Sequence, residues 1–231
     1  MPDQEEINAF RYQYGLFTKK GKFMEKVLVV VDMQNDFVTG SLGTEEAQSI
    51  VPAIAQKIKG YRGNVIATMD THTGEMRYLQ SQEGRYLPIP HCITGTDGWN
   101  LVPEIAAAIE NKESDPFLPP IYMKSTFGCG PMVKALKFNS HKIREIEIVG
   151  VCTDICVISN ALMIKANLPE VQIVVDSSCC AGSTPERHMA ALEVMKSCQI
   201  KVVDGVEYQE LPDNDIEKTP EMIEESGSLP F

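Results

Sequence analysis

Two cysteines stand four positions apart in the segment VGVCTDICVISNA, at Cys152 and Cys156. A thiolate is a nucleophile and a metal ligand, and a protonated thiol packs as a small hydrophobe. The two thiols could therefore form a redox pair, contribute half of a metal site, fill the core, or supply a nucleophile and part of its scaffold. The pair alone allows all four interpretations, so the choice depends on the residues that the fold brings close to it.

Other residues that could do chemistry stand at the ends of apolar runs. Asp32 ends the run KVLVVVD, and Lys124 ends IYMK. Asp70 ends NVIATMD, with His72 just beyond it. Ligands of open parallel sheets bind outside the carboxyl ends of the strands, so these residues and Cys156 are expected at one rim. An acid, a lysine and a cysteine suit nucleophilic catalysis, and Asp-x-His could begin a metal site.

The position of Cys156 favours a nucleophile. If Thr153 or Asp154 caps the following helix, Cys156 lies in the first helical turn, where the macrodipole and free N–H groups stabilise a thiolate and lower its pKa. The same N–H groups could receive the oxyanion of an attacked carbonyl. Lys124 would favour the thiolate further, and Asp32 could carry the proton between the thiol and a leaving amine.

Six short apolar runs are predicted to be the strands that position these residues. They cover residues 26–32, 64–70, 121–124, 145–151, 171–176 and 200–204. Continuous apolar runs of this kind are typical of strands buried on both faces of a parallel sheet. Strand–helix alternation with right-handed crossovers indicates a doubly wound α/β fold. We therefore predict a three-layer αβα sandwich around a parallel sheet of about six strands.

Helical patterns fill the intervals between these runs. Ile50, Ile54 and Ile58 form one apolar stripe, and the pattern ends at Gly60. Other helices are expected after Pro103, from Pro131, after Thr153, and from Pro185 with Thr184 as its N-cap. The connection over residues 71–100 shows little periodicity, and so long a loop in a compact domain is usually functional.

Composition limits the partners and the compartment. The chain has 231 residues and a formal net charge of −11, so it repels phosphate backbones and no nucleic-acid partner is expected. No apolar run is long enough to span a bilayer, and the acidic N-terminus has no signal-peptide pattern. We therefore expect no membrane association and a cytoplasmic location. Seven cysteines, an odd number, favour reduced thiols over a disulfide framework in such a chain.

The chain is predicted to have three parts. Residues 1–25 are an N-terminal extension, residues 26–204 the folded domain, and residues 205–231 an acidic C-terminal tail. We expect the folded domain to act on a small molecule and to assemble as a homo-oligomer.

Three motifs together resemble the isochorismatase-like cysteine hydrolases, and within them the nicotinamidases. They are VVVDMQNDF after the first strand, IYMKSTF at the third, and VGVCTDICV before a helix, and the resemblance covers roughly Val27 to Val203. It implies that the folded domain is a cysteine hydrolase with a catalytic triad of Asp32, Lys124 and Cys156. It also implies a cis peptide between Val151 and Cys152, and an oxyanion hole made by the backbone N–H groups of Cys152 and Cys156.

The resemblance also implies a pocket and a metal. Phe37, Leu87 and Phe127 would line the substrate pocket, with Leu87 standing where the family often has an aromatic residue. In the segment MDTHTGEMRYLQSQEGRYLPIPHC, the ligands of one divalent ion would be Asp70, His72, Glu83 and His91. Carboxylates and imidazoles suit zinc, and also manganese or iron. Open positions on the ion would bind a pyridine nitrogen or water.

The leading hypothesis is hydrolysis of nicotinamide to nicotinate and ammonia through a thioester at Cys156, a step of pyridine nucleotide (NAD) salvage. The same chemistry on another small amide, a carbamoyl or ureido compound, is the first alternative. An isochorismatase reaction is disfavoured, because those enzymes lack the nucleophilic cysteine. A non-enzymatic binding or thiol-sensing protein on the same fold is the alternative of another class, and the intact Asp, Lys and Cys argue against it.

The remaining thiols and imidazoles receive structural interpretations. We expect the side chain of Cys152 to act as filler while its backbone serves the site. The other thiols near strand ends are expected to be core or loop thiols: Cys129, Cys179 and Cys180. His141 and His188 fall on predicted exposed positions and receive no role.

Overall fold

The computed structural model describes residues 25–112 and 118–205. The predicted N-terminal extension and acidic tail lie outside these residues, apart from Glu25 and Gly205. Within the described part of the chain, no helix combines the length and the apolar character that crossing a membrane requires.

A six-stranded parallel sheet forms the centre of the fold, as predicted, in the order β3-β2-β1-β4-β5-β6. β1 lies in the middle and pairs with both β2 and β4. The strands are β1 (Glu25–Val31), β2 (Asn64–Asp70), β3 (Ile121–Lys124), β4 (Ile143–Val151), β5 (Gln172–Ala181) and β6 (Lys201–Val203).

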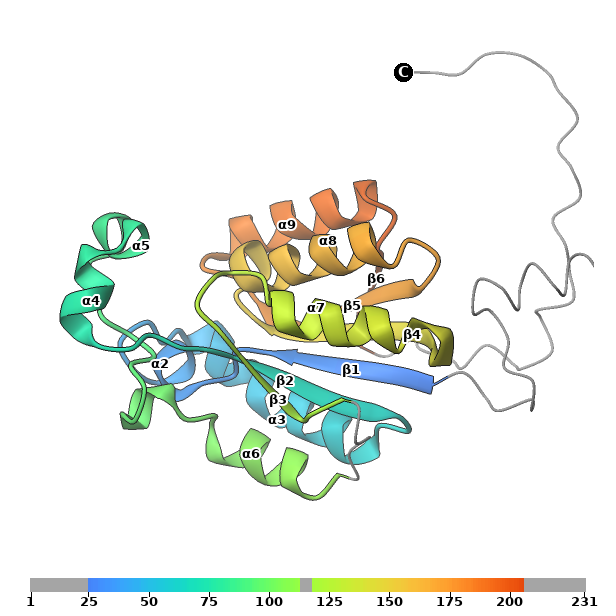
Figure 1. Ribbon diagram of the computed structural model, residues 1–231, viewed down its shortest axis with the longest axis horizontal. Coiled ribbons are helices and arrows are strands. Elements are labelled where there is room, and N and C mark those ends of the chain that lie inside the picture. The colour runs from blue at the N-terminus through green and yellow to red at the C-terminus, as the bar shows by residue number, and fades with distance from the viewer. Residues whose placement is uncertain (1–24, 113–117, 206–231) are drawn as a thin grey trace, which may run out of the picture.

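Helices cover both faces of this sheet (Figure 1). One face carries α7 (Gly130–Phe138), α8 (Ile158–Asn167) and α9 (Pro185–Ser197), and the other carries α3 (Glu45–Gly60) and α6 (Pro103–Glu110). The result is the predicted three-layer αβα sandwich. Short 3-10 turns, η1 (Asp97–Trp99) and η2 (Ser140–Lys142), and the single-turn α2 (Asn35–Val38) complete the connections around these helices.

The core is divided by the sheet into two apolar layers. In β1, Val27, Val29 and Val31 face the layer under α7, α8 and α9, whereas Leu28 and Val30 face the layer under α3 and α6. All five side chains are fully buried. The continuous apolar run at residues 27–31 therefore reflects burial on both faces of the central strand, as predicted.

Helix starts follow the predicted signals where a side chain can cap. Thr184 accepts a hydrogen bond from the N–H of Arg187 at 3.3 Å, and Pro185 stands at the first helical position of α9. α3 begins earlier than the isoleucine stripe indicated, because Thr44 caps it by accepting from the N–H of Ala47 at 3.0 Å.

The long connection after β2 differs from the prediction. It contains two short helices, α4 (Glu75–Gln80) and α5 (Gln82–Tyr86), which lie beyond the end of the sheet in Figure 1. They are too short to show a helical period in the sequence. The connection then returns to the segment that follows β1, because the N–H of Val102 donates to Met33 O at 2.9 Å and the N–H of Asn35 donates to Asn100 O at 2.9 Å.

Close packing at the end of β4 explains a glycine in the VGV sequence. Gly150 has φ of +117°, and a Cβ there would lie 2.2 Å from the carbonyl oxygen of Val31 in β1. A larger residue would push the two central strands apart at their carboxyl ends. β5 pairs with β4 through a register shift at this point and continues to Ala181, past the predicted end at residue 176.

Candidate active site

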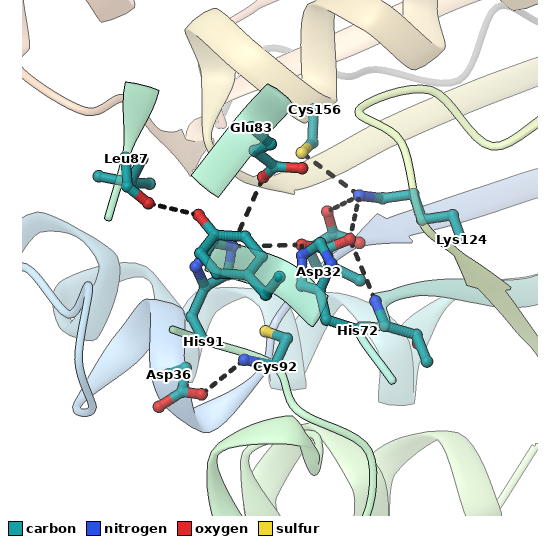
Figure 2. A network of polar contacts seen from close by, with 12 residues as sticks. Asp32, Asp36, His72, Glu83, Leu87, His91, Cys92, Lys124 and Cys156 are labelled. Carbon is teal, nitrogen blue, oxygen red and sulfur yellow. Dashed lines mark hydrogen bonds and ion pairs between the residues drawn. The ribbon is translucent and has the colours of Figure 1, made fainter. Parts of the chain in front are cut away.

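The carboxyl ends of β1, β2 and β3 and the segment after β4 bring the predicted triad together. Figure 2 shows the Lys124 ammonium between Asp32 and Cys156. Its Nζ atom lies 2.7 Å from Asp32 Oδ2 and donates to Cys156 Sγ at 3.4 Å. Asp70 Oδ1 lies 3.6 Å from the same ammonium. All four side chains are buried, so these charges interact with little solvent screening.

Asp32 is held as a proton acceptor. It follows β1 with φ of +50°, and its Oδ1 accepts a hydrogen bond from Thr68 Oγ1 at 2.7 Å. Within the described residues, its buried Oδ2 has no hydrogen-bond partner beyond the ion pair with Lys124. Burial raises the pKa of Asp32, and the opposing charge of Lys124 reduces that rise without cancelling it. An oxygen of this kind can take a proton from the adjacent thiol.

The pKa of the Cys156 thiol differs from the one expected from the sequence. Its pKa is raised well above the usual value by burial and by the charge of Asp32, and Lys124 opposes this only in part. The resting nucleophile is therefore a thiol and not the thiolate that a helix N-terminus would favour. Its activation depends on transfer of the proton to a base at the moment of attack.

The predicted capping of the helix after β4 is also wrong. Residues Thr153–Val157 form a π-helical turn, η3, before α8 begins, and no side chain caps it. Thr153 Oγ1 instead lies 2.8 Å from Nδ1 of the half-buried His188 in α9, which was assigned no role. Asp154 accepts hydrogen bonds from the N–H and Oγ of Ser183, at 2.7 and 2.6 Å. Both side chains fasten the nucleophile segment to the start of α9.

The backbone before the nucleophile has the expected cis peptide bond, between Val151 and Cys152. The carbonyl oxygen of Cys152 accepts hydrogen bonds from the N–H groups of Ile155 and Val157, at 3.0 and 3.1 Å. The oxyanion hole expected from the N–H groups of Cys152 and Cys156 stays a prediction. The half-buried Cys152 thiol has its pKa raised to about 12, chiefly by burial.

Four predicted metal ligands converge next to the triad. One ligand atom from each of Asp70, His72, Glu83 and His91 lies within 4.8 Å of the others. Asp70 Oδ2 is the centre of the group, at 3.1 Å from His72 Nε2 and 3.5 Å from His91 Nε2. Glu83 Oε1 lies 3.7 Å from His91 Nε2. Glu83 therefore stands with the other three, as the resemblance implied.

The backbone presents the two imidazoles in a defined way. His91 Nδ1 lies 2.9 Å from Ile89 O, so this nitrogen carries the proton it donates and Nε2 is left to accept or to bind a metal. The N–H of His72 donates to Cys92 O at 3.0 Å, which joins the two ends of the connection. Asp36 Oδ2 accepts from the N–H of Cys92 at 2.7 Å and so holds the residue beside His91 (Figure 2).

The donor set fits a divalent cation. Among the described residues, Asp32, Asp70 and Glu83 supply three carboxylates to this region, and Lys124 supplies the one ammonium. Burial raises the pKa of Glu83, and the charge of Asp70 raises it further. A divalent ion would offset this excess of negative charge. Two imidazole nitrogens and two carboxylates also match the ligands that zinc, manganese and iron accept.

Two residues of the site were not found by sequence reasoning. Gln34 is fully buried, accepts from the N–H of Asp70 at 2.7 Å and donates to Asp70 O at 2.9 Å, so it clamps the backbone of a predicted ligand. Tyr78 in α4 packs its ring 4.7 Å from His72 and 4.9 Å from His91, and donates to Leu87 O at 2.7 Å. The only indication of Gln34 in the sequence is its position inside the VVVDMQNDF motif.

A third missed residue is Asn160, a fully buried amide in α8. Its Oδ1 accepts from the N–H of Cys129 at 2.8 Å. Its Nδ2 donates to Cys156 O at 2.8 Å and to Phe127 O at 3.2 Å. Asn160 therefore connects the nucleophile to the segment that follows Lys124. Cys129 is buried at the start of α7, and Cys179 and Cys180 are buried in β5, so all three are core thiols.

A cavity of about 870 Å³ opens beside the cluster of metal ligands. His72, Glu83, Leu87, Phe127 and Ile155 belong to its lining. Leu87 and Phe127 thus lie at the pocket, as expected. Phe37 in α2 is not part of this lining, because it packs against the core layer under α3 and α6, with its ring centroid 5.4 Å from that of His91.

The comparison with known sequences identifies relatives along most of the chain. Residues 26–207 match the family model described as the isochorismatase domain. An uncharacterized isochorismatase family protein of Bacillus subtilis is 32% identical over 177 residues, which cover 73% of this chain and 93% of that protein. The nicotinamidase/pyrazinamidase of Mycobacterium tuberculosis is 28% identical over 196 residues, which cover 77% and 98%.

Solved structures agree with this result. A nicotinamidase/pyrazinamidase from Bacillus subtilis superposes with a TM-score of 0.66 at 26% identity, covering 78% of this chain and 100% of that one. A pyrazinamidase of Pyrococcus horikoshii in complex with zinc gives 0.63 at 27% identity, covering 78% and 99%. The chain therefore belongs to the isochorismatase family, and with these relatives it is a hydrolase that acts on amide bonds.

Proposed function

We propose that this enzyme hydrolyses nicotinamide to nicotinate and ammonia through a thioester at Cys156. The single observation that carries the proposal is the contact of Lys124 Nζ with both Asp32 and Cys156, at 2.7 and 3.4 Å, beside the cluster of four metal ligands. The similarity to proteins named nicotinamidases supports the choice of substrate.

In the first half of the reaction, Asp32 takes the proton of the Cys156 thiol as the sulfur attacks the amide carbon. The carbon–nitrogen bond then breaks, and Asp32 returns the proton to the nitrogen, which leaves as ammonia. Lys124 holds Asp32 ionised and donates to the sulfur while its charge develops. In the second half, Asp32 takes a proton from water, the hydroxyl attacks the thioester, and the sulfur leaves and regains a proton.

The metal ligands would hold the ring end of the substrate. Asp70, His72, Glu83 and His91 would bind one divalent ion, which we propose to be zinc, with manganese or iron as the alternatives. The ion, when bound, offers open coordination positions to a pyridine nitrogen or to water. Tyr78 and Gln34 keep the ligands in place by packing and by hydrogen bonds. We further propose a cytoplasmic location and a homo-oligomer.

Replacing Cys156 by Ala tests the mechanism. The variant should release no ammonia from nicotinamide while it keeps the metal content of the wild type, since the ligands belong to other elements. Ammonia release and metal analysis on the same preparation separate the two effects. Retained turnover in Cys156→Ala would overturn the thioester mechanism.

A second candidate is hydrolysis of another small amide, a carbamoyl or ureido compound, by the same thiol chemistry. Leu87 at the pocket favours it, because an aliphatic side chain does not stack on a pyridine ring as an aromatic one does. Chelation separates the candidates. Hydrolysis of nicotinamide should stop when the metal is removed, whereas activity that persists without metal on a ureido compound would select the second candidate.

A further inference from the structure

The cavity beside the site is larger than a pyridine carboxamide requires. Its volume of about 870 Å³ lies in the upper part of the range of 300–1,000 Å³ that is usual for drug-sized ligands. Its lining combines apolar side chains such as Phe127 and Leu87 with several hydroxyl groups, including those of Thr73 and Ser125. A substrate that fills it must carry more than the reacting amide and a single ring.

One residue of the lining carries a charge that nothing in the described chain neutralises. Arg77 in α4 is exposed, and its guanidinium donates to Thr73 Oγ1 at 3.4 Å. Among the described residues, no carboxylate forms an ion pair with it, whereas Lys57 and Lys124 each have two carboxylate partners and Lys196 has one. Arg77 is also the only lysine or arginine of the cavity lining. Apart from the N–H that donates to Thr73, its donors are free to receive an anion from the cavity.

The other charges of the lining do not provide a partner for Arg77. Glu83 is the one carboxylate there, and it belongs to the metal ligands, 3.7 Å from His91. The rest of the protein repels anions, since its formal net charge is −11. A cation that is unpaired at this place therefore selects for a negative group that enters with the substrate.

We propose that the preferred substrate of this enzyme is an amide with a second, anionic group, a carboxylate or phosphate, which Arg77 binds from α4. The inference rests on the proposed amide hydrolysis and names its substrate class. The reacting amide lies at Cys156 and the body of the substrate lies against the apolar lining. The anion accepts hydrogen bonds from the guanidinium in the cavity lining, with the hydroxyl groups as further donors.

Matched pairs of amides test this substrate class. The first pair is a nicotinamide with a ring carboxylate and the methyl ester of that compound. The second pair is glutaramate and its methyl ester. The two pairs differ in the distance between the amide and the carboxylate. In the wild type, at least one carboxylate should exceed its ester in kcat/KM by about 2- to 5-fold, the usual value of an ion pair at an exposed side chain. The advantage should shrink as salt is added.

Arg77→Gln should reduce the ratio of carboxylate to ester to near one, and Arg77→Lys should restore part of it. Arg85→Gln is the matched control, because it removes an equal charge from the exposed face of neighbouring α5, outside the cavity lining. Arg85→Gln should keep the wild-type ratio. The inference is overturned if the wild type shows no preference for either carboxylate, or if Arg77→Gln leaves the preference intact.

Nicotinamide, measured in the same assay, keeps this result apart from the proposed function. Turnover of nicotinamide with no preference for carboxylates overturns the substrate class alone. Turnover of a carboxylated amide without turnover of nicotinamide supports the substrate class and rejects nicotinamide. If no amide reacts, binding of the same pairs to Cys156→Ala by calorimetry decides the question, with a tighter Kd for the carboxylate expected by the same factor.

Discussion

The triad and the cavity wall differ in the elements that carry them. Asp32, Lys124 and Cys156 lie at or just beyond the carboxyl ends of β1, β3 and β4 and are 0%, 5% and 6% exposed. Tyr86 and Phe127, which line the cavity, are 84% and 49% exposed and lie on short helices or loops. The reacting groups are thus fixed by the sheet, while the groups that meet the rest of the substrate belong to connections whose packing is looser.

This difference shows how the chemistry and the substrate choice can be separated. A change in the buried triad alters charges that the fold itself must balance, so it affects stability and turnover together. A change in the long connection alters binding with little effect on the sheet. The ligands Asp70, His72 and His91 lie between the two regions, since Asp70 ends β2 and the imidazoles follow it.

The largest effects are expected from breaking the buried ion pair. Asp32→Asn should lower kcat/KM by about 1,000-fold or more, because the general base is lost. It should also lower the free energy of unfolding by about 3 kcal/mol, because the buried charge of Lys124 loses its nearer carboxylate and keeps only Asp70, at 3.6 Å. Turnover and denaturant unfolding measure the two effects.

A double variant separates these effects. Asp32→Leu combined with Lys124→Met removes both charges and should recover most of the stability, without recovering turnover. If Asp32→Asn instead unfolds at the wild-type denaturant concentration, the ion pair is not the buried, unscreened contact described above.

Sequence reasoning predicts the strand-borne part of this site well, for a physical reason. A parallel sheet brings the ends of its strands to one edge, so a polar residue that ends an apolar run is placed without any knowledge of distant contacts. Asp32, Asp70 and Lys124 were located in this way. The family resemblance added the two ligands that no strand end marks, Glu83 and His91.

The rest of the site depends on contacts between distant residues. Thr153 and Asp154 have the residue types of helix caps, but tertiary partners in α9 and the segment before it outcompete the local capping bond. Asn160 and Gln34 act on residues more than 30 positions away, at Cys129 and Asp70, so no local pattern reveals them. The thiol pKa was predicted with the wrong sign, because burial outweighs the helix N-terminus.

Removing a metal ligand should give the next largest effect and leave the thiol region intact. His91→Ala should abolish stoichiometric metal binding and lower kcat/KM for nicotinamide by about 100-fold. Asp36→Ala, which releases the N–H of Cys92 beside this ligand, should weaken metal affinity by about 10-fold. Metal titration followed by assay measures both.

His141→Ala is the control for these variants, since His141 is exposed and lies outside the ligand cluster. Its metal content and turnover should match the wild type. Full activity in metal-free His91→Ala would show that the cluster plays no part in turnover. The metal ligands would then not connect the triad with the cavity wall in function.

The pH dependence of alkylation tests the state of the nucleophile. Because burial and Asp32 raise the pKa of Cys156, the thiolate fraction should still be rising at pH 9. The rate of iodoacetamide labelling at Cys156 should therefore increase about tenfold per pH unit between pH 7 and 9. Mass spectrometry of the labelled peptide measures the rate, and Cys156→Ala corrects for other thiols. A plateau below pH 8 would indicate a thiolate stabilised in the resting enzyme, as first expected from the helix.

The smallest effect is expected at the neighbouring thiol. Cys152→Ala should change kcat/KM by no more than about twofold, since the pKa of this thiol is raised to about 12 and its side chain packs without a role in proton transfer. The backbone of residue 152, which precedes η3 and accepts from Ile155 and Val157, is unchanged by the substitution. A redox pair would require both sulfurs. That interpretation would be favoured if Cys152→Ala lost most of its turnover and the remaining activity were no longer sensitive to oxidant. Equal turnover of the variant and the wild type, before and after treatment with reductant, would show that the two cysteines of the motif are unequal and that only Cys156 takes part in the chemistry.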